Sequence, residues 1–340
     1  MQRIILIPDR IKENVKIEKE IFGKDYKIIA QGKKVAEDIP IENWQSADAI
    51  LAWHEINYDA ELISKLENCK IIVRVGVGYD NVDIQAANKR KIIVCNVPDY
   101  GTNDVADHTI ALLLTLCRGI NAYNLEIKTN RSWEWNSIGE LKRLDGLTIG
   151  IVGLGRIGSA VALRSKAFGL NVSFFDPYLS TGVEKVFDYK RYYSLYDMIS
   201  NCDIVSFHVP LTNETLYMVD NKFFTQIKKG SIILNTARGK IIKFNSLYDA
   251  LKNNLVKAAG LDVLEHEPPD YNHPLLSAWQ KQEPWIKNRL IITPHAAFYN
   301  NESFVEMREK AAMEAKRILE GKEPKNRINE TLNSTDKKTI

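Results

Sequence analysis

The sequence predicts an α/β protein made of two doubly wound domains, each built around a parallel sheet. Three observations support this fold class. The chain has 340 residues, which is more than a single hydrophobic core usually serves. Short apolar runs alternate with helical patterns along most of its length. A glycine-rich turn between a strand and a helix begins only near residue 148, so another α/β unit precedes it.

The first unit is predicted from short apolar segments that are bounded by turn residues. A helical pattern such as that of residues 60–67 separates neighbouring segments, as parallel strands require. Residues 105–115 then form an unbroken apolar helix, which we expect to be buried at a domain or subunit contact. The predicted strands are residues 3–7, 26–30, 49–53, 71–75 and 92–96.

The second unit continues the same alternation after the glycine turn. Its last strand is followed by a Pro-His turn and a final helix, residues 303–319, that can return to the first unit. The polar tail, residues 322–340, is expected to be frayed. The predicted strands of this unit are residues 148–152, 172–175, 204–208, 231–235, 258–263 and 289–293, and its predicted helices are residues 159–168, 195–199, 221–227 and 245–253.

Composition and charge exclude several classes of protein. The hydrophobic fraction of 45% and the charged fraction of 26% are typical of a globular protein. The net charge of +3 comes from 46 basic and 43 acidic residues mixed along the chain, which predicts no nucleic-acid or membrane partner. No signal peptide or membrane span is apparent, so a cytoplasmic location is expected. Cys69, Cys95, Cys117 and Cys202 show no metal-ligand spacing, and no metal site is predicted.

The strand, glycine turn and helix at residues 148–168 predict a dinucleotide site. Gly153 permits the tight turn, Gly155 lets the backbone approach a pyrophosphate, and Gly158 lets the helix lie close to the strand. The phosphates would bind the N–H groups at the helix N-terminus. Asp176 follows 21 residues after Gly155, where a carboxylate can accept hydrogen bonds from ribose hydroxyls and repel a 2′-phosphate. The pattern therefore favours NAD over NADP as the cofactor.

Three polar residues follow three predicted strands of the second unit. Arg238, Glu267 and His295 would meet at the carboxyl edge of the parallel sheet, where such folds bind ligands. An arginine can hold a substrate carboxylate with two hydrogen bonds, and an imidazolium can donate a proton to a developing alkoxide. The carboxylate would keep that imidazole charged and oriented. Singly, the arginine could be a surface ion-pair partner and the histidine an ordinary turn residue. Beside a dinucleotide site, the set favours hydride transfer at a carbonyl.

At these residues the chain resembles the D-isomer-specific 2-hydroxyacid dehydrogenase family, over residues 43–320. The likeness is carried by six segments in the family's order. They are Arg74-Val-Gly-Val-Gly-Tyr-Asp-Asn-Val-Asp83, Gly150 to Gly158, His208-Val-Pro-Leu-Thr-Asn-Glu-Thr215, Asn235-Thr-Ala-Arg-Gly239, Gly260-Leu-Asp-Val-Leu-Glu-His-Glu-Pro268 and Thr293-Pro-His-Ala-Ala297.

The resemblance implies a fold and a site. It implies a discontinuous, flavodoxin-like substrate domain of residues 1–100 and 296–330, a Rossmann NAD-binding domain of residues 101–295, and a tail of residues 331–340. It implies a homodimer with an arm near residues 121–135, and Arg238, Glu267 and His295 as catalytic residues acting on a small 2-keto or 2-hydroxy acid. The implied substrate contacts are Arg74, Val75, Gly76, Val77, Gly78, Tyr100 and Phe298. The implied cofactor contacts are Gly153, Gly155, Arg156, Ile157, Gly158, Asp176, Pro177, Tyr178, His208, Val209, Pro210, Thr215, Thr236, Ala237, Arg238, Asp262, His295 and Ala297.

Within the family, the chain is most similar to the C-terminal-binding-protein branch, which contains transcriptional corepressors and bacterial relatives. The alternative to an enzyme is therefore an NAD-sensing scaffold that binds partner peptides. The corepressors carry a tryptophan at the position of Phe298 and a long tail, and neither is present here. Formate dehydrogenases share the fold but are associated with a glutamine where this chain has Glu267. These differences favour the dehydrogenase.

Four further residues invite a functional interpretation. Lys243 stands where the family usually has an acid that caps the next helix, so we expect Asn245 to take over that cap. His108 lies on an apolar helix and is expected to be structural rather than a second proton carrier. Trp279 and Trp285 lie in a predicted loop, residues 272–288, and either close over the substrate or contact a partner subunit.

Overall fold

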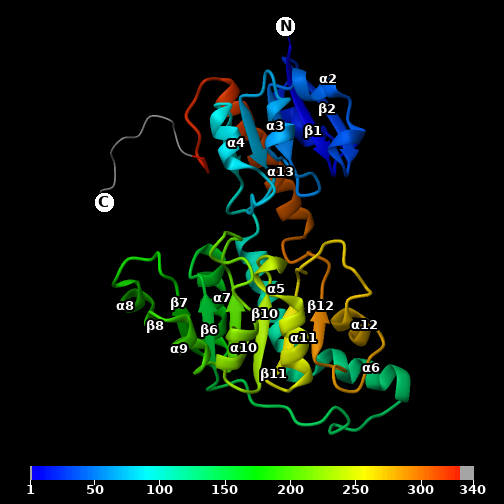
Figure 1. The fold of residues 1–340 in the computed structure, drawn as a ribbon, viewed down its shortest axis with the longest axis vertical. Helices are drawn as coiled ribbons and strands as arrows, with labels where there is room; N and C mark the ends of the chain where they lie inside the picture. Colours follow the sequence, from blue (N-terminus) through cyan, green and yellow to red (C-terminus); the bar gives the residue numbers. More distant parts are fainter. Residues whose placement is uncertain (1, 330–340) are drawn as a thin grey trace. The chain divides into compact units, whose positions relative to one another are not determined.

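The protein is described by a computed structural model that covers residues 2–329. The chain divides into two compact units (Figure 1). One unit contains the chain up to Gly101 together with the segment that starts at Asn300, and the other contains Thr102–Tyr299. The predicted tail of residues 331–340 lies outside the described residues.

The first unit is a five-stranded parallel sheet in the order β2-β1-β3-β4-β5. Most residues of β1, and all of β3 and β4, are buried, so these strands read as short continuous apolar runs rather than as alternating ones. This is the flavodoxin-like order, and it confirms the predicted fold class. The strands are β1 Arg3–Asp9, β2 Tyr26–Lys33, β3 Ala49–Ala52, β4 Ile71–Arg74 and β5 Ile93–Asn96.

The helices of this unit begin at side-chain caps in several cases. Asp59 and Asp83 accept hydrogen bonds from Leu62 N–H and Ala86 N–H, at the starts of α3 and α4. The long helix α13 packs against β3, β4 and α1, as expected for a segment that returns to this unit (Figure 1). The helices are α1 Lys16–Phe22, α2 Ile41–Ser46, α3 Ala60–Ser64, α4 Ile84–Lys89 and α13 Asn301–Leu319.

The expectation of a frayed tail is wrong for the residues that the structure describes. Asn329 is buried, its side-chain amide donates to the carbonyl of Ile92, and its side-chain oxygen accepts from Val94 N–H. Arg327 forms a bridge with Cys95 on β5. The edge of the sheet is thereby covered, which satisfies polar groups that an open edge strand would expose.

The second unit is a seven-stranded parallel sheet in the order β12-β11-β10-β9-β6-β7-β8. The strand order reverses at β6, and the crevice beside such a reversal is where doubly wound sheets bind ligands. The predicted second sheet is confirmed, and the short edge strand β8 is an addition to it. The strands are β6 Thr148–Val152, β7 Asn171–Phe175, β8 Lys190–Tyr192, β9 Ile204–Phe207, β10 Ser231–Asn235, β11 Val256–Leu261 and β12 Leu290–Ile292.

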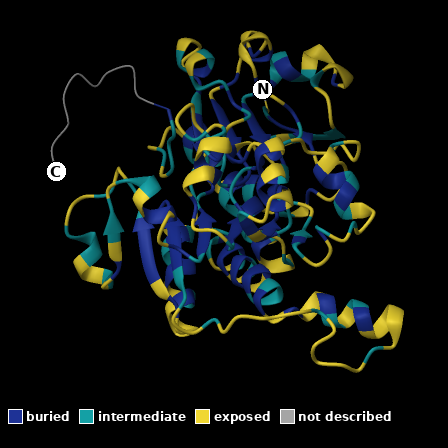
Figure 2. Ribbon diagram, turned by 60° about the horizontal axis from the view of Figure 1, so that its bottom comes forward, coloured by how far each residue is buried: buried dark blue, intermediate teal, exposed yellow. Residues whose placement is uncertain are grey.

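Two buried clusters lie in this unit, one around β9, β10 and α11 and the other around α5, α7 and β6. The strands are largely buried, whereas the segment that follows α6 is exposed (Figure 2). All four cysteines are buried and free. The helices are α5 Thr102–Arg118, α6 Ile120–Asn130, α7 Arg156–Ala167, α8 Val183–Phe187, α9 Leu195–Ile199, α10 Asn221–Gln226, α11 Phe244–Lys252 and α12 Pro274–Gln280.

Candidate active site

Three neighbouring strands of the second unit carry the predicted catalytic residues. β10, β11 and β12 pair in parallel, so their carboxyl ends lie at one edge of the sheet. Arg238 follows β10, Glu267 follows β11 and His295 follows β12. The topology therefore brings an arginine, a carboxylate and a histidine to one edge, as the sequence predicts.

The turn that carries Arg238 is fixed by the buried side chain of Asn235. Its amide donates to the carbonyl of Arg238 at 2.9 Å, and its oxygen accepts from Ala237 N–H at 3.0 Å. A Cβ atom at Gly239 would overlap the backbone of Leu264, so this turn lies directly against the segment that leads to Glu267. The roles of Asn235 and Gly239 were not predictable from the sequence, because they depend on a contact between distant segments.

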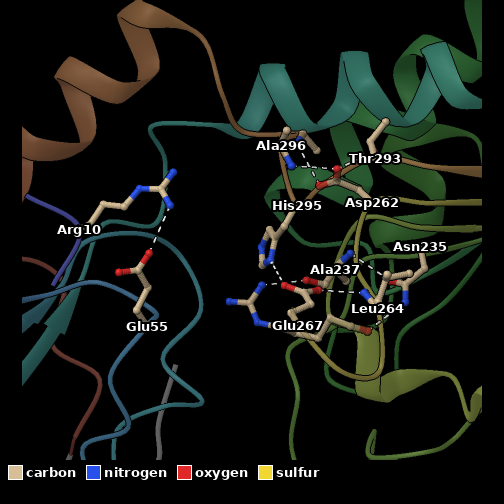
Figure 3. Close-up of polar contacts among 12 residues, drawn as sticks. Arg10, Glu55, Asn235, Ala237, Asp262, Leu264, Glu267, Thr293, His295 and Ala296 are labelled. Atoms are coloured by element: carbon tan, nitrogen blue, oxygen red, sulfur yellow. Dashed lines mark hydrogen bonds and ion pairs between the residues drawn. The ribbon is translucent and has the colours of Figure 1, made fainter. Parts of the chain in front are cut away.

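Glu267 and His295 form a hydrogen-bonded pair (Figure 3). His295 Nδ1 lies 2.6 Å from Glu267 Oε2, and Glu267 Oε1 accepts from Leu264 N–H at 2.8 Å. Burial acts to raise the pKa of Glu267, but the hydrogen bond with His295, the Leu264 N–H and the charge of Arg238 together lower it. An ionised carboxylate only accepts hydrogen bonds, so Nδ1 of His295 donates.

The backbone of His295 is held in the left-handed region, with φ of 53°. Such a conformation is uncommon for a residue other than glycine, and the surroundings must maintain it. Asp262 supplies the contacts: its backbone carbonyl accepts from His295 N–H, and its buried carboxylate accepts from Ala296 N–H and Ala297 N–H at 2.9 Å each. Thr293 also donates to this carboxylate, at 2.6 Å (Figure 3).

Two other histidines of this unit are unsuited to proton transfer. His208 follows β9, is partly buried and hydrogen-bonds to Ser206, and desolvation lowers its pKa to about 3. It is therefore neutral at physiological pH. His273 begins α12 and accepts from Leu275 N–H through Nδ1, and burial lowers its pKa as well. His295, by contrast, has a carboxylate at hydrogen-bond distance.

The glycine turn after β6 has the shape that a dinucleotide needs. Gly153 has φ of 88°, and a Cβ there would come within 2.8 Å of the carbonyl oxygen of His208. A Cβ at Gly158 would overlap the carbonyl of Gly153, whereas one at Gly155 would meet no atom within 4 Å. The first and third glycines thus allow close packing, and the space over the second admits a ligand. Helix α7 starts at Arg156, so its N-terminal N–H groups face that space.

Asp176 stands at the end of β7 beside this turn. Its carboxylate accepts from Leu154 N–H and Tyr178 N–H, both at 3.0 Å. Each carboxylate oxygen retains capacity to accept a further hydrogen bond. The position suits the recognition of ribose hydroxyls, and its negative charge disfavours a phosphate there. The residues of this cradle therefore fit NAD.

The predicted substrate contacts other than Phe298 lie in the first unit. Arg74 ends β4 and is buried, and its guanidinium bonds to the carbonyl of Val75. The loop that follows is tied to β5, since Val97 N–H donates to Gly76 and the Asn96 amide donates to Val77. Gly76 has φ of 144°, and a Cβ there would overlap the Arg74 side chain. The loop is therefore shaped around the arginine.

The expectation that Asn245 caps α11 is wrong. The helix starts at Phe244, whose N–H donates to the carboxylate of Glu265 at 2.8 Å, while Asn245 pairs with His273. The family usually has an acidic residue at the position of Lys243. In this chain Glu265, in the loop after β11, supplies the carboxylate instead. A partner from another segment satisfies an exposed helix N–H as well as a local cap does.

The expected loop at residues 272–288 contains helix α12, and both tryptophans contact their own unit. Trp279 packs against the core and donates to the carbonyl of Leu290 at 3.0 Å. Trp285 packs edge-on against Tyr248 and donates to Glu283. These contacts attach both side chains to their own unit, and both remain partly exposed, so closure over the substrate or contact with a partner subunit stays a prediction.

Within residues 2–329, no group of histidine, cysteine and acidic side chains has the arrangement of a metal site. Over the same described residues, no helix is long and apolar enough to cross a membrane.

Comparison with known proteins gives consistent matches. Residues 110–297 match the family model of the D-isomer specific 2-hydroxyacid dehydrogenase, NAD binding domain. The D-3-phosphoglycerate dehydrogenase of Methanocaldococcus jannaschii is 34% identical over 337 residues, which cover 96% of this chain but only 59% of that relative. The chain thus spans about three fifths of that relative's length. The glyoxylate reductase of Korarchaeum cryptofilum is 33% identical over 87% of each chain.

A solved structure agrees with these matches. The D-lactate dehydrogenase from Aquifex aeolicus, complexed with NAD and lactic acid, has a TM-score of 0.81 and 29% identity, over 93% of this chain and 96% of that one. The match to an NAD-binding domain confirms the cofactor that the glycine motif predicts. The roles of individual site residues stay predictions.

Proposed function

Because the chain belongs to the D-isomer specific 2-hydroxyacid dehydrogenase family, we propose that it catalyses reversible hydride transfer between NAD and a small 2-keto or D-2-hydroxy acid. The observation that carries this proposal is the hydrogen bond between His295 Nδ1 and Glu267 Oε2, at the sheet edge that also carries Arg238. A carboxylate that orients an imidazole is the arrangement that general acid–base catalysis at a carbonyl requires.

Arg238, Glu267 and His295 would have separate roles in the reaction. The Arg238 guanidinium would bind the substrate carboxylate and orient the carbonyl. Since Nδ1 of His295 faces Glu267, Nε2 is the nitrogen that would donate a proton to the carbonyl oxygen during reduction and take it back during oxidation. Bound NADH would supply the hydride for the carbonyl carbon, and the product would be the hydroxy acid and NAD⁺.

The cofactor would be held by the turn and strand ends of the second unit. The Gly153–Gly158 turn and the N-terminus of α7 would bind the pyrophosphate, and Asp176 would bind the ribose. The remaining contacts would come from the ends of β7, β9, β10, β11 and β12, namely Pro177, Tyr178, His208, Val209, Pro210, Thr215, Thr236, Ala237, Asp262 and Ala297.

Recognition of the substrate would fall largely to the first unit. Arg74 and the N–H groups of the Gly76–Gly78 loop would bind the carboxylate, and Tyr100, together with Phe298 of the second unit, would limit the size of the side chain. These residues do not identify one acid, since the matched relatives act on different ones by name.

We also propose a homodimer and a cytoplasmic location. The support for the dimer is the arm that follows α6, where Trp133 and Trp135 are 86% and 81% exposed, together with Ile127 of α6, which is 44% exposed. Exposed large apolar side chains are typical of a protein interface. Membership of the C-terminal-binding-protein branch stays a prediction from the sequence. A peptide-binding scaffold is the competing function.

A panel of 2-keto acids with NADH tests the proposed function. Glyoxylate, pyruvate, hydroxypyruvate and longer aliphatic keto acids should be assayed by loss of NADH absorbance, with His295→Ala as the control. We expect turnover of at least one acid by the parent and none by the variant, while both bind NAD. If a folded, NAD-bound parent turns over no keto acid of the panel, the dehydrogenase assignment is wrong.

A further inference from the structure

Helix α5 contacts both catalytic loops through two adjacent residues. His108 Nε2 lies 2.9 Å from Thr293 Oγ1, and Thr109 Oγ1 lies 2.8 Å from Thr236 Oγ1. Thr293 is two residues before His295, and Thr236 is two residues before Arg238. The helix packs against β10 and β11, which places these side chains at the ends of the strands.

The direction of each hydrogen bond follows from the number of protons available. Thr293 has one hydroxyl proton and gives it to Asp262 at 2.6 Å, so it must accept from His108, which therefore carries a proton on Nε2. Thr109 gives its proton to the carbonyl of Val105 at 2.7 Å, so it accepts from Thr236. Each of the two hydrogen bonds therefore has only one possible assignment of donor and acceptor.

The contact of His108 reaches the catalytic histidine through Asp262. The same carboxylate that accepts from Thr293 also accepts from Ala296 and Ala297, and it holds His295 in its left-handed conformation. Loss of the His108 contact would let Thr293 rotate and weaken this arrangement. Thr109 is fully buried, so loss of its hydroxyl would leave the buried Thr236 hydroxyl without that acceptor.

We propose that His108 and Thr109, called here the anchor pair, are positioning residues that set the places of His295 and Arg238 relative to one another. His108 acts through Thr293 and Asp262, and Thr109 acts through Thr236. Neither residue touches the reacting atoms. The inference rests on the proposed function, and it gives a positioning role to His108, which the sequence alone predicts to be structural. A packing role alone requires the shape of these side chains but not their hydrogen-bonding groups.

Substitutions that keep shape and exchange hydrogen-bonding groups test the anchor pair. His108→Gln places an amide N–H within reach of Thr293, whereas the shorter His108→Asn does not. Thr109→Ser keeps the hydroxyl, and Thr109→Val removes it at nearly constant volume. Thr115→Val, farther along the same helix, is the matched control. For each variant, kcat and KM for a keto acid, NADH affinity and the thermal midpoint would be measured.

Substitutions at the two residues of the anchor pair should have different kinetic effects. His108→Asn should lower kcat about 10- to 100-fold, because displacement of a catalytic group by about 1 Å has an effect of that size, and His108→Gln should recover most of it. Thr109→Val should mainly raise KM, by about tenfold, because it displaces the residue that binds the carboxylate, and Thr109→Ser should restore it. Because Thr236 and Asp262 are also proposed cofactor contacts, kcat and KM for the keto acid would be determined at saturating NADH in every variant. The proposal is overturned if His108→Asn and Thr109→Val have control values of kcat and KM, or if His108→Gln is as impaired as His108→Asn.

A spectroscopic measurement separates this proposal from the proposed function. The protein has six histidines, so the imidazole signals of ring-labelled protein can be assigned by substitution, with His295→Ala identifying His295. His108→Asn should shift or broaden the His295 signal, while Thr115→Val should leave it unchanged. This result would support the anchor pair even if the parent reduced no keto acid. An unchanged His295 signal in His108→Asn would overturn the proposal even in an active enzyme.

Discussion

Glu267→Gln tests whether the carboxylate favours the charged form of His295. The substitution keeps an oxygen that can accept from Nδ1 and removes the negative charge. Because reduction requires the imidazolium, loss of the charge should move the alkaline fall of kcat/KM for reduction to lower pH. Oxidation requires the neutral imidazole, so its acid limb should move in the same direction.

The size of the shift follows from the geometry of the pair. Two unit charges about 4 Å apart interact by about 1 kcal/mol in bulk water and about 4 kcal/mol near a protein surface. The side chains of His295 and Glu267 are 29% and 34% exposed, so solvent screens the pair and the lower part of that range applies. About 1.4 kcal/mol corresponds to about one pH unit. Both profiles should therefore shift by about one unit.

The assay is kcat/KM against pH in both directions for the parent and Glu267→Gln, at constant ionic strength. A second consequence concerns stability: since the folded state lowers the pKa of Glu267, its ionised form contributes stability that is present at neutral pH and lost as pH falls through that lowered value. Glu267→Gln has no carboxylate at this position, so it should not show this loss of stability at acid pH. Profiles that coincide with those of the parent would remove Glu267 from the proton transfer.

Four further substitutions test the cofactor and substrate sites. The parent should use NADH at least about tenfold better than NADPH, equal to about 1.4 kcal/mol, and Asp176→Ala should narrow that gap; equal use by the parent would refute the role of Asp176. Arg238→Lys should lower kcat/KM for a keto acid about 100-fold with NADH affinity unchanged, and near-parent activity would place the carboxylate clamp elsewhere. Arg74→Ala should raise KM more than it lowers kcat, which initial rates over a range of keto acid concentrations would show. In Gly158→Ala the new Cβ would overlap the carbonyl of Gly153, so titration should show at least about tenfold weaker NADH binding, and parent-like binding would contradict the close packing.

The elements that the sequence predicts best are those whose pattern reflects local burial. β10 and α9 have the predicted bounds because an apolar run and a capping serine, Ser194, mark them. The strand β8 was missed because it is a three-residue edge strand, Lys190–Tyr192, that has one neighbour and no fully buried residue. β8 is a strand because it pairs with β7, and its own residues show no strand pattern. The α12 helix was missed because it is only seven residues long and lies within a segment that was predicted as a loop.

The candidate site was predictable as far as topology determines it. Parallel strands in a known order bring the residues after their carboxyl ends together, so Arg238, Glu267 and His295 could be grouped from their positions alone. Contacts such as Thr109 with Thr236, or Gly239 with the Leu264 backbone, join segments whose separation in space no local pattern encodes. Such contacts depend on the packing of α5 and of neighbouring loops, which requires the folded chain.

The distribution of the proposed site residues over the chain has a consequence for the kinetics. The proposed proton carrier, its carboxylate and the cofactor cradle all lie within Thr102–Tyr299, whereas Arg74 and its glycine loop belong to the other unit. Interactions that are equal in the ground state and the transition state change KM alone, while those made only in the transition state change kcat. Changes at Arg74 and its glycine loop should therefore act mainly on KM, and changes at His295 or Glu267 should alter the proton transfer that all of the acids share.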